Sequence, residues 1–390
     1  MSTAIAFLSG KGGSGKTTLA LSMADLLCRC GVQTLLVDCD MSTNGATYFY
    51  ESQLSNKSKQ HRLFSFDTLF CTDHCSCEKN ILKVGSNLSF VPSISEISGQ
   101  YLMEENKFNS RSFESNLSEF LVWARSDYDV ILFDCQAGYT EILPALLPLT
   151  DVDIFVLEAD SISGSAMRSL HLKIGNSLGN ARLYQIFNKA TPEEFDIYSK
   201  IVGTFFINIG TLLFDWKIRQ AFSRSQIPDL ENTSAKYGSD LCNICKIILP
   251  DEDTQKKLEH FSTRLLYQRF DEERKQIEDE LGNLSKPGSF HKRLAQSSSI
   301  IALIGVTISY FYSILLKESL RDFTSNIILT SSVLLGFLAI MLFFTTDTML
   351  ERRNERQKYE KKLKDLDKEL KKIERQLQDG TNNNVDKGQE

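Results

Sequence analysis

Apolar and polar positions along this chain follow two different patterns, and the change falls near residue 250. Up to that point, short apolar runs are separated by amphipathic stretches. We predict strands at 4–8, 33–38, 88–92, 129–134, 152–157, 182–187 and 201–207, and helices at 18–30, 65–70, 78–84, 113–124, 161–174 and 234–249. Strands that alternate with helices predict an α/β fold with a mostly parallel, doubly wound sheet and helices on both faces.

Beyond residue 250 the chain is predicted to be helical. Thr254 to Leu284 has apolar residues at helical spacing among many charges, which predicts a long amphipathic helix. From Tyr359 to Leu377 the apolar residues step by four and three positions, which is the a/d pattern of a coiled coil. This helix pairs either with the amphipathic helix of its own chain, in antiparallel orientation, or with another protomer. The predicted domains are an α/β domain (1–250), a stalk helix (251–286), two apolar segments (297–316 and 326–344), a coiled-coil helix (348–378) and a disordered tail (379–390).

The two apolar segments are predicted to cross a membrane. They contain 20 and 19 residues and almost no charge, and a helix of that length spans about 30 Å of hydrocarbon. A buried helix of a soluble protein is the alternative, but two such segments in tandem favour a membrane hairpin. Basic residues lie on the outer side of both segments, at 291–293 and 352–358, so both termini are expected in the cytosol. We therefore expect a multi-pass protein of the cytoplasmic (inner) membrane with two spans.

Residues 9–18, SGKGGSGKTT, lie between the first predicted strand and the first predicted helix. They match the Gly-x4-Gly-Lys-Thr pattern of a phosphate-binding loop, whose amides and helix N-terminus face an anion. Lys16 is expected to reach the β- and γ-phosphates, and the Thr17 hydroxyl to complete a Mg²⁺ shell. The predicted nucleotide contacts in the loop are Gly12, Gly13, Ser14, Gly15, Lys16, Thr17 and Thr18. The sequence therefore predicts an ATP site with Mg²⁺ as cofactor.

Three aspartates follow two of the predicted strands. Asp38 and Asp40 end the second strand, and Asp134 ends the strand at 129–134. Acidic residues at the carboxyl ends of strands beside a phosphate-binding loop lie where Mg²⁺ and the attacking water must be arranged. We therefore predict Asp38 and Asp134, with Thr17, as the metal residues. The alternative for Asp38 and Asp40 is a helix cap.

Lys11 is a second lysine in the loop, five residues before Lys16. With it, the loop resembles the ParA/MinD family of deviant Walker-A ATPases, whose motif reads Lys-Gly-Gly-x-Gly-Lys-Thr. The resemblance covers residues 1–250 and implies that Lys11 contacts the nucleotide of a partner subunit in an ATP-dependent homodimer. It also implies that Asp40 orients or activates water, which makes Lys11, Lys16 and Asp40 the predicted catalytic residues. Asn188 matches the family's adenine contact, although a turn-forming role is equally open from its position alone.

Nine cysteines, with no signal peptide ahead of the first strand, predict a reducing cytosol. One group consists of Cys71, His74, Cys75 and Cys77. Its spacing does not fit the usual zinc patterns, so we expect an ordinary structural segment there. Cys242 and Cys245 either clamp a metal across a dimer or pack as core thiols, and their helical spacing favours the core.

These features predict a slow, partner-stimulated ATPase that works as a membrane-anchored dimerisation switch and recruits or remodels an unknown protein partner. A weakly hydrolysing sensor or membrane-effector subunit of a defence or secretion system is the alternative. A bacterial tyrosine kinase is disfavoured, because no tyrosine follows Tyr359 and the apolar segments come after the ATPase. The net charge of −6 gives no general case for nucleic-acid binding.

Overall fold

The computed structural model describes residues 2–58, 63–70, 80–94, 110–191, 193–194, 206–230, 235–285 and 353–377. Both predicted membrane segments, the group from Cys71 to Cys77 and the predicted tail lie outside these ranges. The chain divides into two compact units, one made largely of Met1–Gln268 and the other of Arg269–Gln378.

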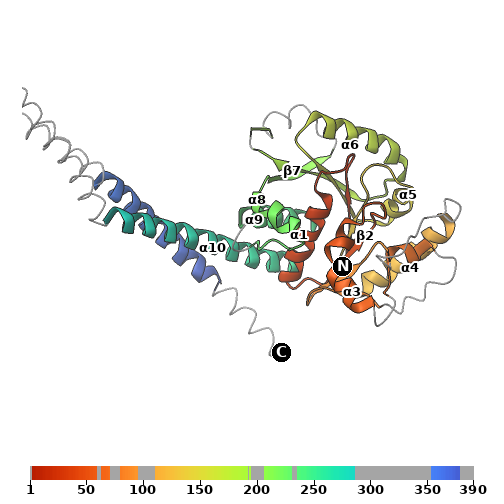
Figure 1. The fold of residues 1–390 in the computed structure, drawn as a ribbon, viewed down its shortest axis with the longest axis horizontal. Coiled ribbons are helices and arrows are strands. Elements are labelled where there is room, and N and C mark those ends of the chain that lie inside the picture. The colour runs from red at the N-terminus through yellow and green to blue at the C-terminus, as the bar shows by residue number, and fades with distance from the viewer. Residues whose placement is uncertain are drawn as a thin grey trace, which may run out of the picture. The chain divides into compact units, whose positions relative to one another are not determined.

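The first unit is built on a twisted sheet of eight described strands, in the order β3-β4-β2-β5-β1-β6-β7-β8 (Figure 1). The strands are β1 Thr3–Leu8, β2 Thr34–Asp38, β3 Leu82–Lys83, β4 Leu88–Val91, β5 Val130–Asp134, β6 Val152–Leu157, β7 Arg182–Ala190 and β8 Ile207–Leu213. All neighbours pair in parallel except β3 and β4. The predicted α/β fold with a mostly parallel sheet is confirmed.

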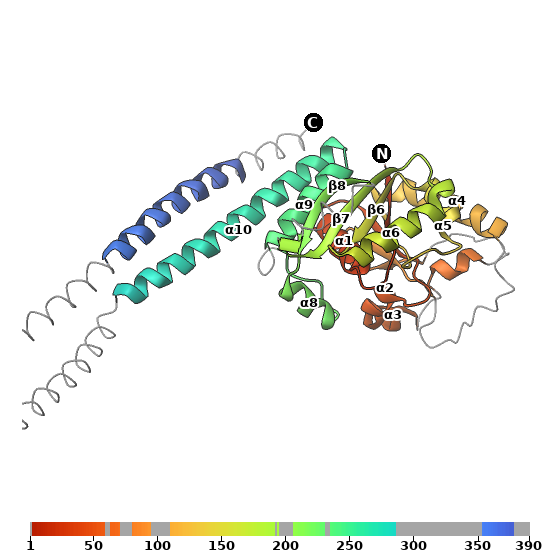
Figure 2. The same ribbon diagram turned by 90° about the horizontal axis from the view of Figure 1, so that it is seen from above.

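Helices cover both faces of this sheet (Figure 2). They are α1 Lys16–Arg29, α2 Gly45–Phe49, α3 Glu51–Ser58, α4 Ser110–Asp127, α5 Leu143–Leu146, α6 Ser161–Ile174, α8 Trp216–Ser223, α9 Ala235–Ile248 and α10 Glu252–Ser285, with short 3₁₀ turns at Phe66–Phe70, Leu147–Leu149 and Gly175–Ser177. One core cluster joins the sheet to α1, α9 and the first turns of α10, and the other joins it to α4, α5 and α6. The first turns of α10 therefore belong to the first unit.

The central strand β1 illustrates why the apolar runs fold as strands. Ile5 and Phe7 pack into one core cluster, whereas Ala4, Ala6 and Leu8 pack into the other. All five are fully buried, because a parallel strand covered by helices on both faces has no solvent-facing side. Burial of a side chain such as Phe7 contributes roughly 1.5–3 kcal/mol.

One predicted element was wrong. The described part of the segment 78–84, predicted as a helix, contains the two-residue strand β3, which pairs with β4 through Leu82 and Phe90. This correction comes from long-range pairing, which a local apolar pattern does not record. Most of the strand predicted at 201–207 lies outside the described residues; the described strand β8 begins at Ile207, pairs with β7 and packs against α9.

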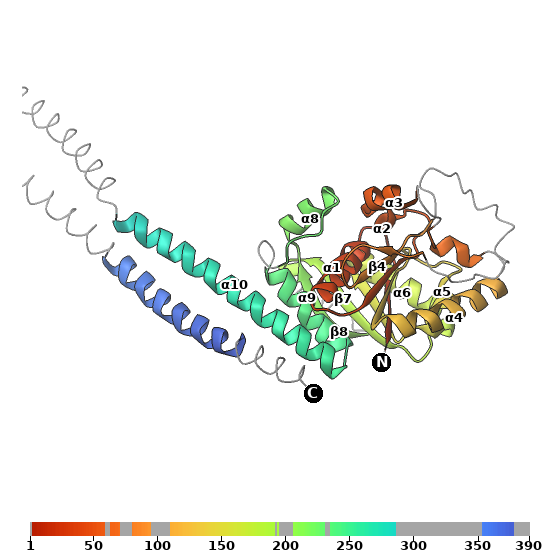
Figure 3. The ribbon, with the colours of Figure 1, turned by 90° about the horizontal axis from the view of Figure 1, so that it is seen from below.

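The second unit contains an antiparallel helix pair (Figure 3). The end of α10 lies along a helix at 353–377, with Lys362 Nζ 2.8 Å from Glu273 Oε1 and Arg274 Nε 3.3 Å from Asp367 Oδ1. The predicted heptad residues form the contact, since Leu366, Leu370 and Ile373 are buried. Antiparallel pairing within one chain is therefore confirmed. Among the described residues, no helix is both long enough and apolar enough to cross a bilayer.

Candidate nucleotide site at the carboxyl edge of the sheet

The phosphate-binding loop connects β1 to α1, as the sequence predicts. Lys16 opens α1 and is 7 % exposed, and its Nζ donates a hydrogen bond of 2.9 Å to Ser9 Oγ. Gly15 lies at the helix N-cap with a left-handed φ of 87°. The amides of the first helical turn and a buried ammonium group thus lie at the same end of α1, which is an arrangement suited to binding an anion.

The second lysine of the loop is held elsewhere. Lys11 Nζ lies 2.8 Å from Glu158 Oε2 and 3.0 Å from Asp160 Oδ2, and all three side chains are partly exposed. The hydrogen bond to Glu158 raises the pKa of Lys11, with a further contribution from Asp160, so the ammonium stays charged. Asp160 also caps α6 by accepting a hydrogen bond from the Ser163 amide. The role of Lys11 across a dimer remains a prediction.

Asp134 has the properties of a metal residue. It ends β5, is fully buried, and neither of its carboxylate oxygens accepts a hydrogen bond from the residues that the structure describes. Burial raises its pKa to about 6, although the Thr17 hydroxyl and the Lys16 charge act in the opposite direction. A buried carboxylate with two open oxygens beside a threonine hydroxyl fits Mg²⁺, which prefers oxygen ligands.

Asp38 is the neighbour of Asp134 on β2, in direct register with it. Its Oδ2 accepts hydrogen bonds of 2.8 Å from both the amide and the hydroxyl of Thr47, and its Oδ1 accepts one from the Asp40 amide. Burial and the adjacent Asp134 charge raise its pKa to about 7. The oxygens of Asp38 are therefore already engaged, and Asp134 is the better supported of the two predicted metal residues.

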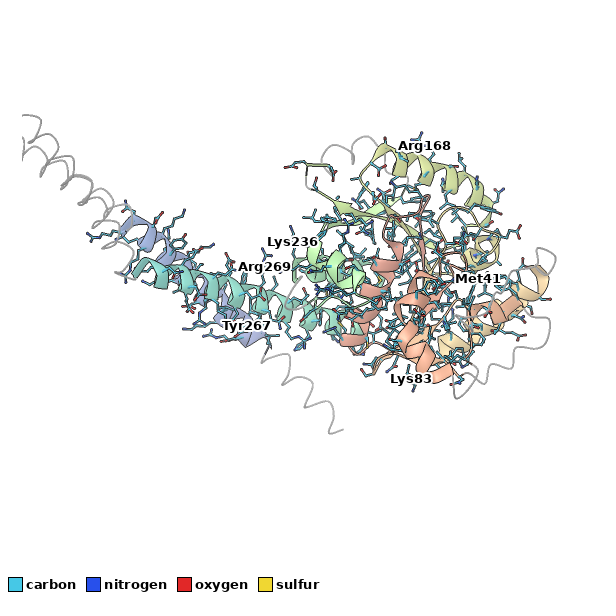
Figure 4. The ribbon with its side chains drawn as sticks, in the orientation of Figure 1. Met41, Lys83, Arg168, Lys236, Tyr267 and Arg269 are labelled. Atoms are coloured by element: carbon cyan, nitrogen blue, oxygen red, sulfur yellow. The ribbon has the colours of Figure 1, made fainter. Side chains whose placement is uncertain are left out.

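Asp40 forms a tight turn directly after β2. Its Oδ1 accepts hydrogen bonds from the amides of Ser42 and Thr43, and its Oδ2 accepts one of 2.6 Å from the Thr43 hydroxyl. Burial acts to raise its pKa, but the bonds from Thr43 and Ser42 outweigh burial and hold the pKa below its usual value. Asp40 is therefore ionised at neutral pH, which suits orienting a water better than abstracting its proton. Met41, labelled in Figure 4, follows Asp40 and packs against the core cluster.

Asn188 and Lys189, near the end of β7, both contact the loop. Asn188 Nδ2 donates a hydrogen bond of 2.9 Å to the Ser14 carbonyl, and Lys189 Nζ donates one to the Gly13 carbonyl. A Cβ on Gly15 would lie 2.3 Å from Asn188 Nδ2, so only glycine fits there. The structure thus brings Asn188 to the site, and its adenine role remains a prediction. The sequence analysis missed Lys189, Glu158 and Asp160, although Lys189 lies near the end of β7 and the two acidic residues follow the end of β6.

The segment after β5 is joined to the phosphate-binding loop. The amide of Gly138 donates a hydrogen bond of 2.8 Å to the Ser9 carbonyl, and Gly138 has a left-handed φ of 79°. This hydrogen bond links the phosphate-binding loop to the backbone four residues beyond Asp134.

The two cysteines of α9 pack in the core. Cys242 and Cys245 are fully buried in the cluster with α1 and α10, and Cys242 Sγ lies 3.2 Å from the Leu258 carbonyl. Burial raises the pKa of both thiols, which keeps them protonated. Of the residues that can be described, no three His, Cys, Asp or Glu side chains are grouped to hold a metal ion. The burial of both thiols in the core cluster agrees with the core interpretation, and a metal clamp across a dimer stays untested.

The site as a whole can bind a nucleoside triphosphate with Mg²⁺ and orient a water for phosphoryl transfer. Lys16 and the loop amides supply the positive charge, Thr17 and Asp134 supply oxygen ligands, and Asp40 supplies a fixed acceptor. Phosphoryl transfer to water needs no covalent nucleophile from the protein. The geometry is that of an ATP-hydrolysing site.

Comparison with known proteins agrees with this geometry. The AAA domain family matches residues 2–176. A plasmid partition protein of Borrelia burgdorferi, bound to AMPPNP, is 20% identical with a TM-score of 0.50, over 64% of this chain and 99% of that one. The MinC:MinD cell division complex of Aquifex aeolicus is 17% identical with a TM-score of 0.49, over 64% of this chain and 97% of that one. Pyrococcus horikoshii MinD with Mg-ADP is 19% identical with a TM-score of 0.45, over 67% of this chain and 95% of that one. No curated protein sequence matches. The chain is therefore a P-loop ATPase whose residues 2–176 match an AAA domain family, and the fold of its first unit, the ATPase unit, is similar to that of the plasmid partition protein.

Proposed function

We propose that this ATPase is a membrane-anchored switch that dimerises with ATP and Mg²⁺, recruits or remodels a protein partner, and resets by slow hydrolysis. ATP is the substrate, and Mg²⁺ neutralises phosphate charge when it is bound. The proposal places both termini in the cytosol and the two apolar segments, 297–316 and 326–344, in the cytoplasmic membrane.

The observation that carries the dimer proposal is the separation of the two lysines of the loop. Lys16 is buried at the phosphate end of α1, whereas Lys11 lies at the surface with Glu158 and Asp160. One lysine is therefore placed for the nucleotide of its own subunit. The other has a partly exposed ammonium that a second phosphate group can compete for, since ion pairs near the surface contribute little stability. In the proposed dimer, that phosphate belongs to the partner's nucleotide.

The proposed hydrolytic step rests on this chain's own residues. Lys16 and the loop amides hold the phosphates, Thr17 and Asp134 hold Mg²⁺, and Asp40 holds the attacking water through its carboxylate. Because the hydrogen bonds to Ser42 and Thr43 keep Asp40 ionised, it is a weak base and hydrolysis is expected to be slow. Slow hydrolysis gives the dimer a long lifetime, which a recruiting switch needs.

The membrane proposal rests on the sequence and on the direction of two helices. The end of α10 and the helix at 353–377 are antiparallel, so the chain between them must return to the side from which it left. A hairpin of two membrane-crossing helices, joined by nine residues, satisfies that requirement. The paired helices then form a cytosolic stalk on which a partner can act.

Analytical ultracentrifugation of the full chain in mild detergent tests the dimer. We expect monomers without nucleotide and dimers with Mg²⁺ and a non-hydrolysable ATP analogue. Lys11→Ala should bind the analogue but stay monomeric, whereas Lys256→Ala, an exposed lysine on α10, should dimerise as the wild type does. A wild-type chain that binds the analogue and remains monomeric would overturn the proposal.

Two further measurements test the other parts. Membranes from expressing cells are washed with alkaline carbonate, which should leave an integral membrane protein in the pellet; release into the supernatant would refute the anchor. Phosphate release is then measured with and without bilayers. A rate that stays near zero under every condition favours the weakly hydrolysing sensor or effector subunit, and leakage of dye from liposomes would support its effector form.

A further inference from the structure

We propose that Asn188 and Lys189 position the phosphate-binding loop by holding the carbonyl groups of Gly13 and Ser14 away from the nucleotide. The proposal rests on ATP binding at this loop and is independent of dimerisation and of the membrane. Neither residue needs to touch the phosphates for this role. They act through the peptide groups that follow Gly13 and Ser14, whose amides face the phosphates of a bound nucleotide.

The contacts come from one strand end and converge on one stretch of loop. Lys189 Nζ donates to the Gly13 carbonyl, and Asn188 Nδ2 donates to the Ser14 carbonyl at 2.9 Å. Asn188 is 4% exposed, and the near-contact of its amide with Gly15 shows how closely it packs on the loop. Two consecutive carbonyls are thus held by donors that lie about 175 residues away in the sequence.

Carbonyl direction matters because each peptide group has two ends of opposite charge. A carbonyl that turns toward the site places partial negative charge against a phosphate and removes an amide donor from it. Gly13 and Gly15, with φ values of 84° and 87°, flank Ser14 and give its two peptide planes unusual freedom to rotate. Two fixed donors on the outer side of the loop restrict that rotation.

The backbone conformation at Lys189 is unusual and accounts for the direction of its side chain. Lys189 has a left-handed φ of 57°, which side-chain-bearing residues rarely adopt. The pairing of β7 with β8 changes register between Asn188 and Ala190, so Lys189 lies at an irregularity of the strand. Such irregularities redirect a side chain next to active sites, and strain of this kind persists where the surroundings enforce it. Here the redirected side chain reaches the Gly13 carbonyl.

Glu158 keeps the lysine in that place. Lys189 Nζ lies 3.4 Å from Glu158 Oε1, while Glu158 Oε2 holds Lys11 at 2.8 Å. The ammonium of Lys189 is therefore shared between a loop carbonyl and a carboxylate. This favours a positioning role over a direct contact with the phosphates.

The test uses the purified full chain in detergent and two probes, ATP and inorganic tripolyphosphate, each with Mg²⁺. Tripolyphosphate lacks a base, so it reports on the phosphate cradle alone. We expect Asn188→Ala and Lys189→Gly each to lower the affinity for both probes by about tenfold. That is the usual effect of losing one hydrogen bond. Lys189→Arg, which keeps a charged donor, should recover most of the loss.

The same variants separate positioning from stability. Lys189→Gly relieves the left-handed strain, so its melting temperature should equal or exceed that of the wild type while its affinity falls. Ser225→Gly is the matched control: Ser225 is exposed at a φ of 51° far along the chain, and its replacement should leave affinity unchanged. Hydrogen exchange without ligand should show faster exchange at residues 12–16 in Asn188→Ala and Lys189→Gly only.

Three results would overturn the proposal. Wild-type affinity of Lys189→Gly for tripolyphosphate would show that the loop does not need the donor. Weaker ATP binding by Asn188→Ala with unchanged tripolyphosphate binding would assign Asn188 to the base instead. Loss of affinity with unchanged exchange in the ligand-free loop would mean a direct phosphate contact. A wild-type chain that failed to dimerise would contradict the proposed switch but would not affect these measurements of ATP affinity, tripolyphosphate affinity and hydrogen exchange.

Discussion

The first unit, the ATPase unit, buries several charged side chains, whereas the ion pairs of the second unit, the helical unit (Arg269–Gln378), lie on exposed faces. In the ATPase unit Lys16, Asp38, Asp134 and Asp153 are buried, and the three carboxyl groups have raised pKa values. In the helical unit the buried residues are apolar, as Leu370 illustrates, and the ion pairs lie on exposed faces.

The difference follows from the cost of removing charge from water. A buried charged group that lacks hydrogen bonds or an opposite charge destabilises the folded state. Such groups are therefore typical of sites where a ligand or a reaction supplies the missing partner. An exposed charge costs little and contributes little, because water and salt screen it. Substitutions of charged residues should therefore have large effects in the ATPase unit and small effects in the helical unit, where apolar residues should dominate.

The largest effect is expected for Lys16→Ala. Loss of the buried ammonium leaves the phosphates of a bound nucleotide without their main counter-charge, and we expect affinity for Mg-ATP to fall by about 10³-fold. Titration of a fluorescent ATP analogue measures this. Lys11 belongs to the same loop but lies near the surface, so Lys11→Ala should change the affinity of the monomer for Mg-ATP less than threefold. Equal losses in the two variants would contradict the separation of the lysines.

Asp153 tests the cost of a buried charge away from the nucleotide. It lies in β6 with no exposed surface, and only its Oδ1 is bonded, to the Thr150 hydroxyl at 2.7 Å. Burial raises its pKa to about 7, although the Thr150 bond opposes the shift. The folded state therefore holds this proton more tightly than the unfolded chain, so the free energy of unfolding should fall as pH rises from about 4 to about 7.

Asp153→Asn should remove this pH dependence, because the amide cannot ionise and its oxygen can still accept the Thr150 bond. We expect the variant to be more stable than the wild type by about 2–4 kcal/mol at pH 8 and nearly equal at pH 4. Urea unfolding of the full chain, followed at both pH values, measures the difference. A gain of the same size at both pH values would point to packing rather than to charge.

In the helical unit the corresponding test is apolar. Leu370 is 5 % exposed at the centre of the contact between the helix at 353–377 and α10. Leu370→Ala should destabilise the pair by about 2 kcal/mol, the lower end for a core leucine, because a two-helix contact relaxes easily. Hydrogen exchange at residues 366–374 should become faster. Lys368→Ala, on the exposed side, should leave exchange unchanged; a similar effect of both variants would mean that the seam is not what holds the helices.

Local patterns predicted much of the nucleotide site. The phosphate-binding loop and the ends of two buried strands lie in short contiguous stretches, and parallel strands bring their carboxyl ends to one edge. Lys16, Thr17, Asp40 and Asp134 were therefore found at that edge as predicted. The heptad steps from Tyr359 to Leu377 likewise predicted which residues are buried.

The rest depended on contacts between distant residues. The amide and hydroxyl of Thr47 both donate to Oδ2 of Asp38, and Glu158 engages two lysines from separate segments. No spacing rule links these residues, because loops that converge at a sheet edge are positioned by the whole fold. The two-residue strand β3 was missed for the same reason, since its pairing with β4 and not its own pattern makes it a strand.

The smallest effect should come from the ion pair between Arg274 and Asp367. Its charged groups are 3.3 Å apart, but the side chains are 40 % and 46 % exposed. Glu278 also accepts from Arg274, so loss of Asp367 leaves the guanidinium with another partner. A double-mutant cycle of Arg274→Ala and Asp367→Ala should give no measurable coupling in the hydrogen exchange of residues 353–377 at physiological salt. A coupling that matches the effect of Leu370→Ala and persists at high salt would show that exposed charge holds this helix pair, and the contrast between the two units would then fail.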